Sequence, residues 1–469
     1  MLTRHRKLRI VLASLVLAVG CLLCCEWVSE FWRSPGARLS HDTGSSAVSL
    51  TNIRWLLQKQ RENDPARVET RLLKSVRYLA SDELEGRGIG TKGLDLAADY
   101  IAHELAYAGL DTSLVDGSPF QVLAGLEARL LATSSEVDAG GAPRQQQKLK
   151  NVVGALPGRG DFGGETIVLG AHYDHLGYGG GWGSLAPWTH DIHNGADDNA
   201  SGTSVMLEVA RQLATRDEKL RRRVLFVAFT AEESGLVGSE YFIGNPFEPI
   251  GDYIAMVNLD MVGYLRRDLE ISGTGTAREF DAIVREVGSE HSLRLVTDPS
   301  GYGPSDHASF HAKGIPVLHL FTGFHENYHR PSDDPEKLNI AGMRQVTQFT
   351  VDLIIRLANA EQRPRPVSGE RGESQFVWAR GASTKSNLGI EADPAFSGRG
   401  VLVRKVATRS AADRAGIRSG DVILKLNQSA VRNLDELQQA ALASDSADAL
   451  QIHVQRFTFV MELELALHP

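Results

Sequence analysis

Cysteine is almost absent from this chain of 469 residues: it has three, and all of them lie within the first 25 positions. The rest of the chain therefore contains no disulfide, no thiolate metal site and no cysteine nucleophile. Basic residues are not in excess either. The net charge of −8 gives no sign of a nucleic-acid partner. The hydrophobic content of 42% and charged content of 23% are ordinary for a globular protein. The length predicts two or more folded units.

A long apolar run is also lacking at the N-terminus. Basic residues at positions 4–9 precede an apolar run at 10–25, which is shorter than the roughly 18–20 residues of a membrane span. This pattern fits a signal segment better, and Ala18 and Gly20 provide small residues before a cleavage point at Cys21. The stretch LAVGC resembles a bacterial lipobox, with Ala18 where that motif prefers leucine. Lipid anchoring at Cys21, a retained short anchor and simple secretion remain open. All three predict an extracytoplasmic location, in the periplasm or at the cell surface, with membrane contact through this segment.

Four further segments follow. We interpret residues 26–69 as a tether, 70–360 as the main domain, 361–375 as a linker rich in proline, glycine and charge, and 376–469 as a separate small domain. In the main domain, short apolar runs alternate with stretches of helical periodicity. The expected strands are 151–156, 166–171, 224–229, 254–259 and 317–321, and the expected helices are 202–214, 236–243, 277–288 and 340–358. Strands that are apolar throughout are buried on both faces. The pattern thus predicts an α/β fold with a doubly wound, mostly parallel sheet and helices on both faces.

Several possible metal ligands follow these strands or lie in glycine-rich or polar loops. They are His172, Asp198, Glu233, Asp260 and His329. Two imidazoles and three carboxylates are enough to hold two zinc ions when one carboxylate is shared. Each residue alone has an ordinary explanation, such as helix capping for the aspartates at 197–198 or a surface position for a loop histidine.

Two neighbouring acids suggest further roles. Asp174 lies two positions after His172, so in an extended chain its carboxylate can accept the second ring N–H of that histidine. Glu232 adjoins Glu233 and points in a different direction. One of the pair can bind metal while the other receives a proton.

The order of these motifs resembles the co-catalytic di-zinc aminopeptidase family, which includes glutamate-carboxypeptidase-like enzymes and glutaminyl cyclases. The resemblance covers about residues 71–359 and includes LASDELEGRGIGTKG, NVVGALPG, AHYDHLG, IHNGADDNASG, FTAEESGLVGS, NLDMVG and YHRPSDDPEKL. It implies a zinc exopeptidase fold with two zinc ions per chain. His172 and Asp260 look like ligands of one zinc.

The resemblance also implies the remaining roles. Glu233 and His329 look like ligands of the second zinc, and Asp198 looks like the bridge. Glu232 looks like the general acid and base, and Tyr328 like a residue that helps to stabilise the oxyanion. The implied function is an exported aminopeptidase that acts on peptides or proteins. The alternatives are a carboxypeptidase, a glutaminyl-cyclase-like enzyme with one zinc, and a peptide-binding scaffold without catalysis.

The C-terminal segment resembles the PDZ domains of bacterial periplasmic proteases through SNLGIEADPAF and AGIRSGDVILKLN. This implies a small β-rich α+β domain. In that family a loop like the one formed by Asn387, Leu388, Gly389 and Ile390 offers backbone N–H groups to the C-terminal carboxylate of a peptide. The alternative is a small packing domain in which Gly389 and Gly420 only form turns.

Overall fold

The computed structural model describes residues 63–124, 148–179, 183–186, 188–216, 220–247, 252–367, 375–380, 385–392, 399–407, 410–418, 420–443, 449–456 and 459–466. The N-terminal signal or anchor segment and nearly all of the predicted tether therefore lie outside the described residues. Within the described part of the chain, no helix combines the length and the apolarity that a bilayer crossing requires.

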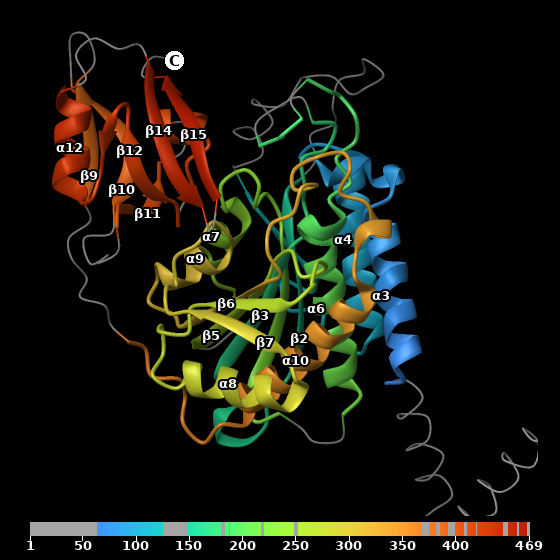
Figure 1. The fold of residues 1–469 in the computed structure, drawn as a ribbon. Helices are drawn as coiled ribbons and strands as arrows, with labels where there is room; N and C mark the ends of the chain where they lie inside the picture. The colour runs from blue at the N-terminus through green and yellow to red at the C-terminus, as the bar shows by residue number, and fades with distance from the viewer. Residues whose placement is uncertain are drawn as a thin grey trace, which may run out of the picture. The chain divides into compact units, whose positions relative to one another are not determined.

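The main domain is built on an eight-stranded sheet (Figure 1). In sheet order the strands are β1 (Phe120–Val122), β2 (Lys150–Leu156), β4 (Arg223–Phe229), β3 (Thr166–His172), β5 (Tyr253–Leu259), β8 (Val317–Phe321), β6 (Asp268–Ser272) and β7 (Arg294–Asp298). The four central strands β4, β3, β5 and β8 run parallel to one another, whereas β1, β2 and β6 pair antiparallel with their neighbours toward the centre. The predicted, mostly parallel sheet is confirmed.

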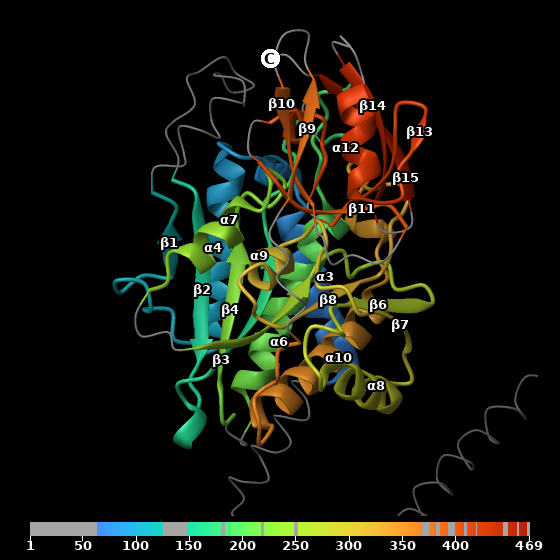
Figure 2. The same cartoon turned by 90° about the vertical axis from the view of Figure 1, so that its left-hand side faces the viewer.

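Helices cover both faces of this sheet (Figures 1 and 2). One face carries α3 (Pro65–Leu79), α4 (Lys92–Tyr107), α6 (Gly202–Ala214), α8 (Phe280–His291) and α10 (Ile340–Asn359), and the other carries α7 (Val237–Gly244) and α9 (His307–His311). Successive residues of β3 point to opposite faces. Ile167 and Leu169 accordingly pack in the larger core, while Val168 packs with Phe242 and Phe310 in the smaller one. The doubly wound arrangement follows from strands that are apolar at every position.

The predicted C-terminal boundary of the tether, at residue 69, is wrong. Helix α3 begins at Pro65, inside the segment 26–69, and Asp64 caps it by accepting a hydrogen bond from the N–H of Ala66 at 3.0 Å. Val68 and Leu72 are fully buried. Three polar residues separate Val68 from Leu72, so the start of the helix has a polar composition although one of its faces packs in the core.

The C-terminal domain is a second sheet with its own core. Its strands run antiparallel in the order β15-β14-β12-β11-β10-β9, with β13 paired to β12. The elements are β9 (Gln375–Arg380), β10 (Lys385–Ala392), β11 (Val401–Val406), α11 (Ala411–Arg414), β12 (Val422–Leu426), β13 (Ser429–Ala430), α12 (Leu434–Ala443), β14 (Ala449–Arg456) and β15 (Phe459–Ala466). Buried Ile390, Leu437 and Ile452 belong to a cluster separate from the two cores of the main domain. The predicted small β-rich α+β domain is confirmed.

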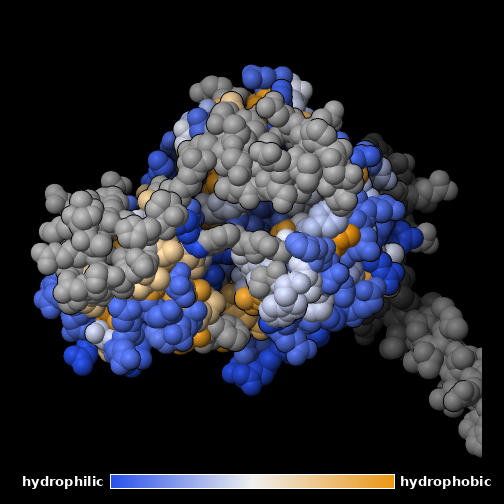
Figure 3. All heavy atoms as spheres, turned by 90° about the horizontal axis from the view of Figure 1, so that it is seen from above, coloured by the Kyte–Doolittle hydropathy of each residue, from blue (hydrophilic) through white to orange (hydrophobic). Residues whose placement is uncertain are grey.

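Short helical turns complete the described chain. They are η1 (Asp82–Arg87), η2 (Gly160–Phe162), η3 (Ala196–Ser201) and η4 (Pro335–Lys337). The described surface seen in Figure 3 is mainly hydrophilic, with apolar residues gathered in smaller areas.

Candidate metal centre

All five predicted ligand residues meet at the carboxyl edge of the parallel strands. His172 is the last residue of β3, Asp260 directly follows β5, and Glu233 lies in the turn after β4. Asp198 lies in η3, before α6, and His329 lies in the loop after β8. The carboxyl ends of neighbouring parallel strands lie side by side, so residues far apart in sequence come together here.

Asp198 lies between two histidines. Its Oδ1 is 3.2 Å from His172 Nε2, and its Oδ2 is 3.0 Å from His329 Nε2. His172 Nε2 is also 3.4 Å from Asp260 Oδ1, and His329 Nε2 is 3.3 Å from Glu233 Oε2. One carboxylate with an oxygen toward each of two donor groups is the arrangement that a shared ligand requires.

The structure adds a residue that the sequence analysis missed. His175 Nδ1 lies 2.8 Å from Glu233 Oε1 and 4.0 Å from Asp198 Oδ2. The donor atoms of these three residues are close enough to hold one ion, as are those of His172, Asp198 and Asp260. The signal was present, because His175 belongs to the same AHYDHLG motif as His172.

Burial supports a cation at this cluster. Each of the two histidines His172 and His329 is about 98–99% buried, and Asp198 is 4% exposed. The buried atoms Asp260 Oδ1, His175 Nε2 and His329 Nε2 make no hydrogen bond with the described residues. Buried polar atoms without a partner are unfavourable. A metal ion would satisfy them, and imidazole with carboxylate is a donor set that zinc accepts.

The charges of the cluster stabilise one another. Burial alone lowers the pKa of His329, but Glu233 and Asp198 outweigh it and raise that pKa to about 9. The pKa of His172 is raised well above its usual value, because Glu232 and Asp260 outweigh its burial. Burial and Glu233 both favour protonation of Asp198, yet the adjacent histidines His172 and His329 hold its pKa below the usual range. The carboxylates of the cluster therefore stabilise positive charge, which in the absence of a metal ion is carried by the two histidines.

The outer nitrogens of the two predicted histidine ligands are held by main-chain oxygens. His329 Nδ1 lies 2.6 Å from the carbonyl oxygen of Gly183, and Leu185 N donates to the carbonyl oxygen of His329 at 3.0 Å. His172 Nδ1 lies 3.2 Å from the carbonyl oxygen of Asp174. When Nδ1 donates to a carbonyl, the ring presents the lone pair of Nε2 to the cluster.

Asp174 differs from its predicted role. Its carboxylate Oδ1 is 3.8 Å from His172 Nδ1, beyond hydrogen-bond distance. The carboxylate instead accepts the N–H groups of Glu232 at 3.0 Å and Glu233 at 3.3 Å. Asp174 therefore fixes the turn that carries both glutamates. Its main chain, and not its side chain, supports His172.

Glu232 and Tyr328 both lie next to this cluster. Glu232 is 4% exposed, and burial raises its pKa well above the usual value for glutamate. The ring of Tyr328 stacks on the ring of His329 with centroids 3.8 Å apart, and burial raises the pKa of its hydroxyl. Both groups therefore lie beside the proposed ligands, and burial favours the protonated form of each.

In the C-terminal domain, the predicted loop residues Asn387, Leu388, Gly389 and Ile390 lie within β10. Leu388 and Ile390 are fully buried, and Gly389 has a φ of +81°, in the left-handed region that favours glycine. Strand β9 pairs antiparallel with β10 and also packs against α12 (Figure 2). The edge of β10 beside α12 is therefore occupied by a strand of the same chain.

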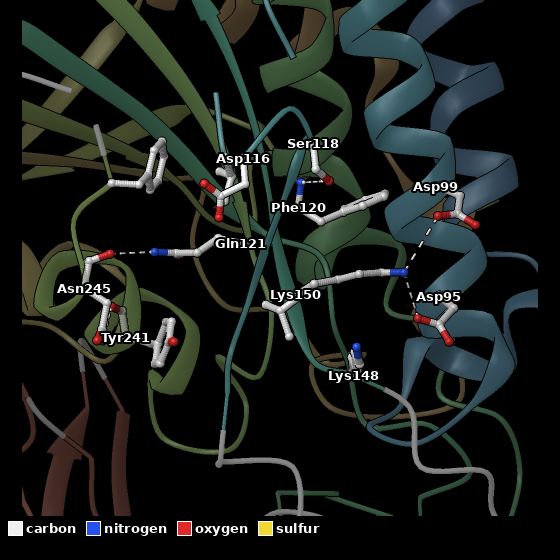
Figure 4. A pocket seen from close by; sticks show the side chains of 13 residues that line it. Asp95, Asp99, Asp116, Ser118, Phe120, Gln121, Lys148, Lys150, Tyr241 and Asn245 are labelled. Atoms are coloured by element: carbon white, nitrogen blue, oxygen red, sulfur yellow. Dashed lines mark hydrogen bonds and ion pairs between the residues drawn. The ribbon is translucent and has the colours of Figure 1, made fainter. Parts of the chain in front are cut away.

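A cavity of about 910 Å³ lies elsewhere, between α4, β1, β2 and α7 (Figure 4). Lys150 crosses it and pairs with Asp95 at 3.0 Å and Asp99 at 3.7 Å. Gln121 donates to the carbonyl oxygen of Asn245 at 2.9 Å. Lys150 and Gln121 are thus satisfied within the protein, and none of the predicted site residues lines this cavity.

Comparisons with known proteins match two separate parts of the chain. Residues 151–354 match Peptidase family M28, and residues 378–467 match the PDZ domain. Leucine aminopeptidase 1 of Uncinocarpus reesii is 30% identical over 228 residues, which are 45% of this chain and 55% of that protein. Aminopeptidase YwaD of Bacillus subtilis is 27% identical over 243 residues, 47% of each chain. The chain therefore spans about half the length of these curated relatives.

Solved structures with a similar chain course include a zinc aminopeptidase of Bacillus subtilis, with a TM-score of 0.48 and 18% identity over 62% of this chain and 95% of that chain. Another is a glutaminyl cyclase of Bacteroides thetaiotaomicron, with a TM-score of 0.47 and 17% identity over 62% of this chain and 97% of that chain.

Proposed function

We propose that the chain is a zinc-dependent aminopeptidase that hydrolyses the N-terminal peptide bond of peptides, because residues 151–354 match Peptidase family M28 and residues 378–467 match the PDZ domain. The position of Asp198, with one carboxylate oxygen toward His172 and the other toward His329, carries this proposal. A shared carboxylate is the feature that distinguishes a two-metal hydrolase from a site for one structural ion.

We assign His172 and Asp260 to one zinc, Glu233 and His329 to the second, and Asp198 to both. Bound zinc supplies a Lewis acid and lowers the pKa of coordinated water to about 7. His329 is preferred over His175 for the second zinc because its Nε2 lies 3.0 Å from Asp198 and 3.3 Å from Glu233, whereas Nδ1 of His175 lies 2.8 Å from Glu233 but 4.0 Å from Asp198. His175 then holds the carboxylate of Glu233 in place.

Glu232 is proposed as the general base. The raised pKa of its buried carboxyl matches the task of taking a proton near neutral pH and passing it to the leaving amine. The carboxylate of Asp174 accepts a hydrogen bond from the backbone N–H of Glu232, which fixes the turn that carries the Glu232 side chain. Tyr328 stays protonated because burial raises the pKa of its hydroxyl, and it is proposed to donate a hydrogen bond to the oxyanion.

A digest of a peptide library combined with metal analysis tests this function. Products shortened at the N-terminus, with two zinc ions per chain, are expected. Shortening at the C-terminus would make the protein a carboxypeptidase. Cyclisation of N-terminal glutamine with one zinc would make it cyclase-like. No turnover with full zinc content would leave a binding scaffold.

The PDZ domain is proposed to bind the C-terminus of a peptide partner at residues 387–390. In this mode the peptide adds a strand to the exposed edge of the sheet. Strand β9 already pairs with that edge and packs against α12, so an incoming peptide must displace it. Bound peptides should therefore compete with β9, and destabilising β9 should tighten peptide binding.

The variant Trp378→Pro tests this competition, because residue 378 pairs with Asn387, and proline fixes φ at about −65° and so disfavours the extended pairing of β9. Trp378→Thr is the matched control, since it changes the same side chain and keeps the N–H. Titration with a fluorescent pool of peptides with free C-termini should show tighter binding to the proline variant than to the threonine variant. Equal affinities would show that β9 does not compete.

We also propose that the protein is exported and held at the membrane through its N-terminal segment. Cell fractionation of the Cys21→Ser variant tests the lipid-anchor form of this proposal. Release of the variant into the soluble extracytoplasmic fraction is expected. Retention at the membrane would favour a short anchor that is not cleaved.

A further inference from the structure

Arg87 is a buried cation of the LASDELEGRGIGTKG motif without a carboxylate partner. Its side chain is fully buried, and none of the described carboxylates lies within ion-pair distance of it. Its donors go to main-chain carbonyls instead: Tyr173 at 2.7 Å, Asn194 at 2.7 Å, Gly195 at 2.9 Å, and Leu79. Burying a charge without a charged partner is unfavourable, so the position calls for a reason other than fold stability alone.

These carbonyls belong to the segments that carry the proposed ligands. Tyr173 directly follows His172, and Gly195 directly precedes the turn with Asp198. The guanidinium is a rigid planar fork, so bonds to several carbonyls fix their relative positions. One side chain thus joins the end of β3 to the turn before α6. The main chain of Arg87 adds one more hydrogen bond, because its carbonyl accepts from His175 N at 3.2 Å.

The backbone around Arg87 is held in an unusual conformation. Glu85, Gly86 and Arg87 have φ values of +51°, +58° and +49° in succession. Left-handed conformation is costly for residues other than glycine and persists only where the surroundings enforce it. A Cβ on Gly86 would lie 2.4 Å from the carbonyl oxygen of His193 and 2.7 Å from that of Gly177. The backbone at Gly86 therefore packs directly against the backbone of the segments that contain Gly177 and His193, which leaves no room for a side chain.

The charge of Arg87 acts on the same cluster. Burial lowers its pKa to about 10, and the carboxylates that oppose this lowering are Asp174, Asp198, Asp333 and Glu233. Arg87 remains protonated near neutral pH and offsets part of the negative charge of the cluster. The hydrogen bonds of Arg87 and its positive charge therefore both act on the segments that carry His172 and Asp198.

We propose that Arg87 is a positioning residue of the metal centre, which holds His172 and Asp198 at the separation required for two ions. The inference rests on the proposed function, because it presumes that the cluster binds zinc. Arg87 is expected to affect zinc binding itself and not only the stability of the fold.

Arg222 provides a matched control. It is also fully buried, and it donates to the carbonyls of Leu357, Ala358 and Ala360. It pairs with Glu165 at 2.6 Å and precedes β4, at the opposite end of the strands from the cluster. Replacing either arginine by lysine keeps the charge and removes the fork.

The experiment measures zinc affinity by competition with a chromophoric chelator, and the melting temperature of the zinc-free protein, for wild type, Arg87→Lys and Arg222→Lys. Arg87→Lys should weaken zinc binding by roughly 10–100-fold, as loss of a group supporting the ligands does. Arg222→Lys should lower the melting temperature and leave zinc affinity unchanged. Wild-type zinc affinity in Arg87→Lys would overturn the proposal. Absence of zinc binding by the wild-type protein would instead refute the proposed function.

Hydrogen exchange on the wild-type protein tests the same coupling if Arg87→Lys does not fold. Removal of zinc should increase amide exchange together at residues 84–88 and 194–199 and leave the segment around Arg222 unchanged. An unchanged rate at 84–88 would overturn the proposal.

Discussion

Replacement of Glu232 by glutamine should separate proton transfer from metal binding. The amide has nearly the same shape as the carboxylate, and the backbone N–H of residue 232, which Asp174 accepts at 3.0 Å, is unaffected. We expect near-normal zinc content and a loss of at least roughly 10²–10⁴-fold in kcat, the usual contribution of a positioned acid or base. This corresponds to about 2.7–5.5 kcal/mol of transition-state stabilisation.

Glu233→Gln should behave differently although the two residues are adjacent. Oε2 of Glu233 is 3.3 Å from His329 Nε2, and its Oε1 is 2.8 Å from His175 Nδ1. Loss of its charge therefore weakens the second proposed zinc site directly. Glu290→Gln is a suitable control, because Glu290 on α8 pairs with Arg356 on α10 and is not one of the proposed site residues. It should change neither zinc content nor rate.

The assay combines kcat and KM on aminoacyl p-nitroanilides with zinc analysis of the same samples. Loss of a zinc from Glu232→Gln while Glu233→Gln retains both would reverse the assignment of the two glutamates. Unchanged hydrolysis in both variants would refute the di-zinc mechanism.

Further predictions concern the metal, the C-terminal domain and the core. Asp198→Asn should reduce zinc to at most one ion per chain and abolish measurable hydrolysis, because Asp198 faces both histidines; full zinc content would exclude a bridging role. In the metal-free site His329 has a pKa of about 9, so it is protonated below that pH and must lose a proton to bind zinc. Zinc affinity should therefore rise with pH up to about 9, and calorimetry in buffers of different ionisation enthalpy should detect the released proton. A chain ending at Ser374 should retain zinc and hydrolysis of small substrates, since the C-terminal domain has a separate core; zinc loss would contradict this. Phe226→Ala in β4 should lower stability by about 3–5 kcal/mol in denaturant titration, because it leaves a cavity at a fully buried position, and a change under 1 kcal/mol would refute it.

Much of the fold could be predicted from local pattern. The expected helix 202–214 coincides with α6, because its apolar positions recur at helical spacing between a glycine and a polar loop. The expected helix 277–288 lies three residues before α8, at 280–291, since its first turn is a polar loop whose composition does not exclude helix. Strands β6 and β7 were not predicted. They are short, and β7 alternates between exposed and half-buried residues, so neither resembles the apolar runs of the sheet centre.

The sequence by itself determined which residues can act at the site. Their donor types and their positions after apolar strands or in loops are local properties that indicated His172, Asp198, Glu233, Asp260 and His329 as candidates. Their separate roles came from the order of the motifs, which resembles the di-zinc aminopeptidase family.

Only the tertiary structure decided how these residues are held. His175 meets Glu233 across 58 positions, and Asp174 accepts the N–H of Glu233 across 59 positions. Arg87 joins Tyr173 and Asn194, which lie 86 and 107 positions after it in the sequence. Likewise, only the pairing of β9 with β10 reveals that the edge predicted to take a peptide is occupied. Such contacts depend on which strand ends become neighbours in the sheet, and no local pattern in the chain records that choice.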